Sequence, residues 1–285
     1  MSDISKELDW GGRRRSYTVH VPPGYVSGTP IPLVVALHGG GGNARSNAVQ
    51  TGFNEEADRS GFIVVHPDGT GEKRPLLNAL GRGHFYTWNA RSCCGYAVQQ
   101  NVDDVGFIRA MLAELQREYA IDPRRVYASG LSNGGMMSYR LAGEMGETFA
   151  AIGVVAAAQT LFECKPTQPV SVLHIHGSAD QNVTLPGGIG AKALDRTPKP
   201  PVMEAIEFWA MFNGCCAAQT APDGKVTKSI YSGGRNGSEV AFYLIDGGGH
   251  SWPGGERMLA MLDEPSQELN ATSLIWEFFA AHPKP

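Results

Sequence analysis

A serine flanked by glycines is the residue in this chain best suited to act as a nucleophile. The segment GLSNG places Ser132 between Gly130 and Gly134, after an apolar stretch and before a segment with helical character. A sharp strand-to-helix turn needs glycines here, because a Cβ at either position would clash as the strand and the helix close on each other. The pattern therefore predicts a nucleophile elbow that displays the serine hydroxyl at the carboxyl edge of a sheet.

A serine hydroxyl is a weak nucleophile at neutral pH and needs a base that a carboxylate orients. After a nucleophile elbow, the carboxylate and the histidine follow the serine in that order. Asp180 lies just beyond the apolar segment VLHIHG, and His250 lies in a glycine-rich loop after the last predicted strand. We expect these three residues to form a catalytic triad. Asp246 is the alternative carboxylate, but it has the position of a turn residue at a strand end.

Backbone amides that could stabilise a negatively charged oxygen follow a second apolar segment. The run HGGGGN supplies free N–H groups directly after a predicted central strand. Such donors must already point at the oxyanion of a tetrahedral intermediate. We assign one donor to Gly40, with Gly41 as the alternative, and the other to Asn133. His38 is expected to shape this loop beside the substrate and not to act as the base.

Other titratable residues have simpler structural explanations. His174 and His176 are two apart on a predicted strand and so face the same side; packed, hydrogen-bonded histidines are favoured there over metal ligands. Asp103 and Asp104 open a predicted helix, where they fit a cap and a partner for the helix dipole. No metal or organic cofactor is predicted, since the chemistry of a triad needs none.

The cysteines leave their pairing open. Their number is odd, and two adjacent pairs do not give the CxxC spacing of a zinc site. One interpretation is a set of buried, unpaired thiols. The other is a disulfide between the Cys93/Cys94 region and the Cys215/Cys216 region, which would favour an exported protein. The fifth cysteine is Cys164.

The elements that must position these residues alternate along the chain. Continuous apolar segments predict buried strands, and apolar residues spaced three or four apart predict amphipathic helices between them. This alternation predicts an α/β fold with a mostly parallel sheet, in a single domain over residues 1–285. The strands are expected at 16–21, 32–38, 62–69, 124–130, 151–157, 170–177, 225–232 and 239–246, and the helices near 47–59 and at 102–119, 133–145, 200–214 and 266–282, the last with a serine cap.

Composition excludes several functions. The chain has 285 residues and a formal net charge of -4, with 24 basic and 28 acidic residues, so it lacks the cationic surplus of a nucleic-acid-binding protein. No apolar run reaches the length of a membrane span, and the N-terminus lacks the apolar core of a signal peptide. The protein is therefore cytoplasmic, or it is a mature secreted form. Oligomeric state is not readable from the sequence.

Five segments together resemble the polyhydroxybutyrate depolymerase and feruloyl esterase group of α/β hydrolases. They are PLVVALHGGGGN, NVDDVGFIRAM, VYASGLSNGGMMSYRLA, HIHGSAD and GGGHSWPGG. The resemblance implies an α/β-hydrolase fold, with Ser132 as nucleophile, His250 as base and Asp180 as its partner. It also implies that Trp252 lies beside the active site. The substrate would be a small-molecule or polysaccharide-linked ester.

Two long loops bear on the choice of ester. Residues 70–100 and 181–201 are too long for plain connections, and long loops in compact domains are usually binding loops or disordered. Trp88 and Tyr96 in the first loop could stack on an aromatic acyl group such as ferulate. Feruloyl or acetyl esters of plant polysaccharide are the first expectation, and hydroxybutyrate oligomers or short aliphatic esters are the second. A peptidase of the prolyl oligopeptidase type and a non-catalytic binding protein are remote alternatives.

Overall fold

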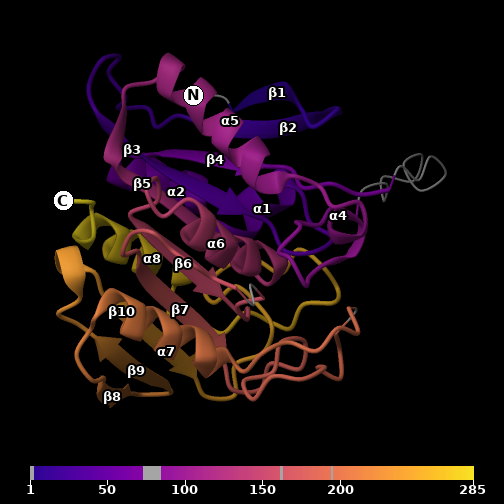
Figure 1. Ribbon diagram of the computed structural model, residues 1–285, viewed down its shortest axis with the longest axis vertical. Helices are drawn as coiled ribbons and strands as arrows, with labels where there is room; N and C mark the ends of the chain where they lie inside the picture. Colours follow the sequence, from indigo (N-terminus) through magenta and orange to yellow (C-terminus); the bar gives the residue numbers. More distant parts are fainter. Residues whose placement is uncertain (1–2, 73–84, 161–162, 194) are drawn as a thin grey trace.

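The sheet of this α/β protein joins strands from the whole length of the chain. The computed structural model describes residues 3–72, 85–160, 163–193 and 195–285 (Figure 1). Ten strands form one sheet in the order β1-β2-β4-β3-β5-β6-β7-β10-β9-β8. The central strands β4-β3-β5-β6-β7-β10 pair in parallel. The outer pairs β1-β2, β2-β4, β10-β9 and β9-β8 are antiparallel. The strands are β1 Ile4–Trp10, β2 Arg13–His20, β3 Ile31–Leu37, β4 Ile63–Pro67, β5 Ile121–Leu131, β6 Ala151–Val155, β7 Ser171–Gly177, β8 Gln219–Asp223, β9 Val226–Tyr231 and β10 Val240–Ile245.

Helices cover both faces of this sheet. One face packs against α5, α6 and α7, which lie over the strands in Figure 1, and the other packs against α2 and α8. The helices are α1 Ala44–Thr51, α2 Phe53–Ser60, α4 Gly95–Gln99, α5 Asp104–Glu118, α6 Asn133–Glu144, α7 Val202–Asn213 and α8 Ala271–Ala281, with a short 3-10 turn at Arg235–Gly237. None of the helices in the described part of the chain combines the length and the apolar character of a membrane span.

Strand β3 shows why the central segments are apolar throughout. Leu33, Val35 and Leu37 point into the core beneath α5 and α6. Val34 and Ala36 point into the core beneath α2 and α8. Because successive side chains alternate between faces and both faces are covered, every position of the strand must be apolar.

Most predicted elements are present, with two corrections. The expected helix near 47–59 is two helices, α1 and α2, because Gly52 between them adopts a left-handed conformation with φ 65°. The closing helix begins at Ala271 and is capped by Asn270, whose side chain accepts a hydrogen bond from Ser273 N at 3.0 Å; the predicted serine cap is wrong. Strands β1 and β8 were not predicted.

The start of α5 has the expected cap and an additional buried ion pair. Asp103 accepts a hydrogen bond from Gly106 N at 2.9 Å, as predicted for a helix cap. Asp104 is fully buried and pairs with Arg15 at 2.7 Å, which ties β2 to this helix. Removing either partner would leave an uncompensated buried charge, so this pair constrains the fold more than a surface ion pair would.

A buried histidine on β4 links stability to pH. His66 Nε2 donates to Asn54 Oδ1 at 2.9 Å, and its Nδ1 accepts from Asn47 Nδ2 at 3.1 Å, so the ring is neutral. Burial lowers the pKa of His66 to about 3. The unfolded chain therefore binds one more proton than the folded chain between the ordinary histidine pKa and about pH 3, and the free energy of unfolding falls as the pH is lowered through this window.

We predict that His66→Gln reduces this acid sensitivity. Glutamine can donate from the position of Nε2 but cannot take up a proton. Between pH 6 and pH 4 the slope of unfolding free energy against pH should fall by about 1.4 kcal/mol per pH unit, the contribution of one proton. Urea unfolding at several pH values measures this slope. An unchanged slope would show that His66 is already protonated in the folded protein.

Candidate active site

The turn between β5 and α6 holds Ser132 in a strained conformation. Ser132 has φ 55° and ψ −120°, which non-glycine residues rarely adopt. Its N–H donates to Val155 O at 2.9 Å, and its carbonyl accepts from Met136 N at 2.9 Å. A Cβ at Gly130 would lie 2.8 Å from Leu37 O, and one at Gly134 would overlap the same oxygen. The two glycines therefore allow the elbow to close, as the sequence pattern predicts.

The loops after β7 and β10 bring together an aspartate and a histidine. His250 Nδ1 lies 2.7 Å from Asp180 Oδ2, and both side chains are buried. Asp180 Oδ1 accepts from Asn182 N at 2.8 Å and from Val183 N at 2.9 Å. Burial raises the pKa of Asp180, but the hydrogen bond and charge of His250 and the Val183 amide outweigh burial and lower it below its usual value. The carboxylate therefore remains ionised beside the imidazole.

A second aspartate, not identified from the sequence, fixes the backbone of His250. Asp263 Oδ2 accepts from His250 N at 2.8 Å, and Asp263 N donates to His250 O at 3.1 Å. Lys192 binds the other carboxylate oxygen at 2.7 Å. Asp246, the alternative triad carboxylate, instead accepts from Ser178 Oγ at 3.3 Å at an exposed turn. The geometry favours Asp180 as the partner of His250.

The candidate oxyanion donors lie next to each other. A Cβ built on Gly40 would lie 3.8 Å from Asn133 Cβ, and both residues line the same cavity as Ser132. Gly41 N–H donates to Tyr86 O at 2.8 Å, so this amide is already used. Within the described residues, no acceptor is found for the N–H of Gly40 or of Asn133. Of the two alternatives in the glycine run, the geometry favours Gly40.

A clamp of side-chain hydrogen bonds holds this pair of amides in place. Trp88 N donates to Asn133 Oδ1 at 2.7 Å, and Asn133 Nδ2 donates back to Trp88 O at 3.0 Å. The indole N–H of Trp88 donates to His38 O at 3.0 Å. His38 Nε2 accepts from Gly69 N at 2.9 Å, so its Nδ1 carries the proton and donates to Gly39 O at 2.8 Å. His38 thus shapes the glycine loop, as predicted, but it is buried and does not line the cavity, so its expected place beside the substrate has no geometric support.

The elbow, the glycine run and the loop that carries His250 surround a cavity of about 350 Å³ at the carboxyl edge of the parallel strands. Ser132 and His250 both line it. The apolar residues that line the cavity come from the cores on both faces of the sheet. Met136 and Val183 belong to the core beneath α6 and α7, and Leu262 belongs to the core beneath α8. Further apolar lining comes from Phe85, Leu131, Met258, Leu259 and Met261, and polar lining from Gln50, Gln99 and Lys199.

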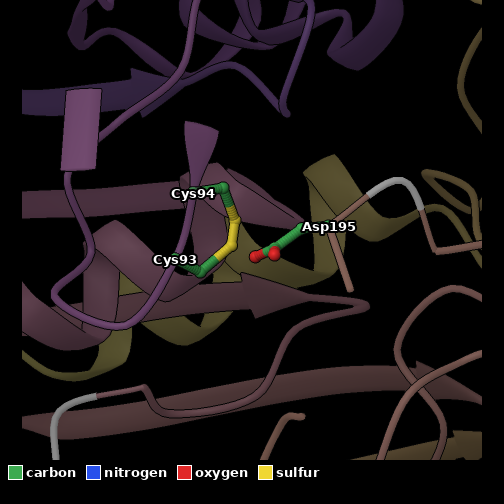
Figure 2. A group of neighbouring side chains, drawn as sticks. All are labelled: Cys93, Cys94 and Asp195. Carbon is green, nitrogen blue, oxygen red and sulfur yellow. A yellow bond between two sulfur atoms is a disulfide. The ribbon is translucent and has the colours of Figure 1, made fainter. Parts of the chain in front are cut away.

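Adjacent cysteines form part of the cavity wall. Cys93 and Cys94 are joined to each other by a disulfide, and Cys164, Cys215 and Cys216 are free thiols. Both interpretations of the cysteines are therefore wrong: Cys93 and Cys94 are paired with each other and not with the 215/216 region, and the free thiol of Cys216 is exposed and not buried. Figure 2 shows the carboxylate of Asp195 directed at the bridge. A carboxylate oxygen of Asp195 and the two sulfurs all lie within 4.8 Å of one another. Sulfurs in a disulfide are not thiolates, so this group is not a metal site in the oxidised protein.

Three aromatic residues expected to contact substrate lie outside the cavity wall. Trp88 and Trp252 are fully buried, and Trp252 donates its indole N–H to Thr272 Oγ1 at 2.9 Å. Tyr96 accepts a hydrogen bond from Arg13 at 3.3 Å. None of the three lines the cavity, so the expected stacking on an acyl group finds no geometric support. Residues 73–84 of the same loop lie outside the described residues.

Gly134→Ala should destabilise the protein by about 3 kcal/mol and reduce activity, because the new Cβ would overlap Leu37 O and lie 2.7 Å from His38 O. The matched control is Gly24→Ala, where a Cβ meets no atom within 4 Å. Urea unfolding and initial rates measure both variants. Equal stability and activity of the two variants would contradict the steric origin of the elbow.

Two substitutions at Asn133 should distinguish the effect of losing the hydrogen bonds to Trp88 from the effect of a negative charge near the oxyanion. Asn133→Ala removes both bonds to Trp88 and should lower kcat about tenfold. Asn133→Asp keeps the acceptor for Trp88 N but adds a negative charge where an oxyanion would form, and should lower kcat by about 100-fold or more. Steady-state kinetics with p-nitrophenyl acetate measures both. A fully active Asn133→Asp enzyme would place the oxyanion elsewhere.

Comparison with known proteins shows the family to which the chain belongs. The family model described as Esterase PHB depolymerase matches residues 15–206. A putative esterase, NocK, from Nocardia uniformis subsp. tsuyamanensis is 31% identical over 271 residues, which cover 88% of this chain and 74% of that protein. Feruloyl esterase B from Piromyces equi is 28% identical over 83% of this chain, but the match spans only 42% of that longer protein.

Solved structures support the fold. The acetyl xylan esterase from Aspergillus awamori superimposes with a TM-score of 0.65 and 16% identity, covering 98% of this chain and 99% of that one. At this identity the likeness shows the α/β-hydrolase fold alone. Together with the family match over most of the chain, these findings show that the protein belongs to the esterase PHB depolymerase family and is a carboxylic ester hydrolase with an α/β-hydrolase fold.

Proposed function

We propose that this chain is a single catalytic domain that hydrolyses carboxylic esters through Ser132, His250 and Asp180. The observation that carries the proposal is the meeting of three separate loops at one cavity. Ser132 is displayed there on a strained elbow, and His250 lines the same cavity with its Nδ1 2.7 Å from Asp180 Oδ2. In the neutral ring, the proton on Nδ1 donates to the carboxylate, and Nε2 is then free to act as the base.

The reaction proceeds through a covalent acyl-enzyme. Ser132 Oγ attacks the ester carbonyl carbon while its proton passes to His250 Nε2. The N–H groups of Gly40 and Asn133 bind the resulting oxyanion. The intermediate collapses, the bond to the alcohol oxygen breaks, and His250 gives its proton to the leaving alcohol. Water then repeats these steps and releases the acid, which restores the free serine.

The proposed substrates are feruloyl or acetyl esters of plant polysaccharide. A cavity of about 350 Å³ with mainly apolar walls is large enough for an extended acyl group. A relative from Piromyces equi that carries the name feruloyl esterase B supports the same choice. A hydroxybutyrate oligomer or a short aliphatic ester is the second candidate, because the matching family model is named for PHB depolymerases.

Ser132→Ala should lose at least about 10⁵-fold in kcat on p-nitrophenyl acetate, since the remaining groups cannot form an acyl-enzyme. The matched control is Ser229→Ala on strand β9, which does not line the cavity. Full activity in Ser132→Ala would refute the proposed mechanism.

A panel of esters tests the substrate. It contains methyl ferulate, acetylated xylan, p-nitrophenyl acetate and butyrate, and a hydroxybutyrate oligomer. The highest kcat/KM is expected for methyl ferulate or acetylated xylan. A preference for the hydroxybutyrate oligomer or the short aliphatic esters would leave the triad intact and support the second candidate.

A further inference from the structure

Three buried aromatic rings form a hydrogen-bonded row behind the candidate triad. Tyr139 Oη lies 2.7 Å from His174 Nδ1, and His174 Nε2 lies 3.1 Å from His176 Nδ1. His176 Nε2 lies 2.8 Å from Val183 O. All three rings are at most 1% exposed. The histidines are therefore packed and hydrogen-bonded, as the sequence predicts.

The acceptor at the end of this row determines the direction of every bond in it. A carbonyl oxygen only accepts, so His176 Nε2 must carry a proton and donate to Val183 O. A neutral imidazole has one N–H, so His176 Nδ1 accepts from His174 Nε2. His174 Nδ1 then accepts from the hydroxyl of Tyr139. A second proton on either ring would require the Tyr139 hydroxyl to accept from His174 Nδ1 instead of donating to it.

Both histidines are neutral in this environment. Burial, and next the neighbouring His176, lower the pKa of His174 well below its usual value. Burial also lowers the pKa of His176, although Asp180 and the Val183 carbonyl oppose this effect. The titratable groups facing the row are Asp180 and His250, while β10 contributes the apolar ring of Phe242 against His174.

The row connects two parts of the candidate active site. Tyr139 is on α6, the helix that begins directly after Ser132. At the other end, Val183 accepts from His176 through its carbonyl and donates through its N–H to Asp180 Oδ1 at 2.9 Å. His176 Nε2 is also 3.6 Å from Asp180 Oδ2, the oxygen that faces His250. His176 thus holds the turn that carries the Asp180 carboxylate through its hydrogen bond to Val183 O.

We propose that His176, kept as the Nε2–H tautomer by its bond to Val183 O, is a positioning residue that holds the Asp180 turn against the base. Apolar residues would fill the same volume without burying polar atoms, whose burial is costly unless they are bonded. Packing alone does not require hydrogen bonds of fixed direction, so the directed bond from His176 to Val183 O indicates a positioning role for these rings. This inference rests on the proposed function, since it assumes that Asp180 serves the triad.

Two substitutions at His176 separate the two ends of the ring. Glutamine places an amide N–H near the position of Nε2 and can still donate to Val183 O. Asparagine places its amide near Nδ1 and cannot reach Val183. His176→Asn should lower kcat about 10- to 100-fold with KM changed less than about twofold, whereas His176→Gln should stay within about threefold of wild type. Equal kcat in the two variants, or a fully active His176→Asn enzyme, would overturn the proposal.

Histidine nitrogen NMR tests the tautomer without relying on turnover. The wild-type protein should show His174 and His176 as neutral Nε2–H tautomers that do not titrate between pH 5 and pH 8. Tyr139→Phe removes the donor to His174 Nδ1 but leaves Val183 O, which fixes the His176 tautomer, so both tautomers should stay unchanged and kcat should fall at most about threefold. An Nδ1–H tautomer at His176, or a ring that becomes charged in this pH range, would overturn the proposal. A failure of the proposed function would appear instead as activity in Ser132→Ala, which leaves the tautomer measurement valid.

Discussion

The close approach of β5, α6 and the end of β3 at the elbow is the constraint on which the rest of the site depends. Neither Gly130 nor Gly134 has room for a Cβ, because the backbone oxygen of Leu37 occupies that space. Closing the turn this tightly forces Ser132 to φ 55°. It also brings the amide of Asn133 beside Gly40, since Gly40 follows the strand that ends at Leu37. One steric arrangement thus sets the positions of both the proposed nucleophile and the proposed oxyanion donors.

Long loops fix the orientation of side chains that the sheet alone does not determine. The loop containing Trp88 bonds to Asn133 on one side and to the carbonyl of His38 on the other. The turn containing Asp180 is held by backbone amides and, we propose, by His176. The side chains of Trp88, Asn133 and Asp180 therefore each have specific partners, as is expected where a reaction requires groups placed to within a fraction of an ångström.

The sequence allowed good prediction where local chemistry determines the structure. The elbow could be recognised because only glycine fits beside Ser132, and the central strands because burial on both faces makes them apolar throughout. The order of carboxylate and histidine predicted Asp180 and His250 as partners, and the structure places His250 Nδ1 2.7 Å from Asp180 Oδ2. Edge strands β1 and β8 were missed because they are partly or wholly exposed and lack that apolar signal.

Features that depend on contacts distant in sequence could not be predicted. Trp88 reads as a candidate for substrate stacking, yet its indole N–H is used by His38 O and its ring is buried. The role of Asp263 depends on a loop that folds back on His250, which no local pattern indicates. Pairing of Cys93 with its neighbour Cys94 likewise cannot be read from the number and spacing of cysteines.

Identification of the residue that carries the acyl group is the most direct measurement. The wild-type protein would be treated with a fluorophosphonate, digested, and its peptides analysed by mass spectrometry. If Ser132 is the nucleophile, a single adduct should map to Ser132, and prior incubation with an ester substrate should slow its formation. An adduct on another serine, or no adduct in an enzyme that still hydrolyses esters, would contradict the assignment of Ser132 as the nucleophile.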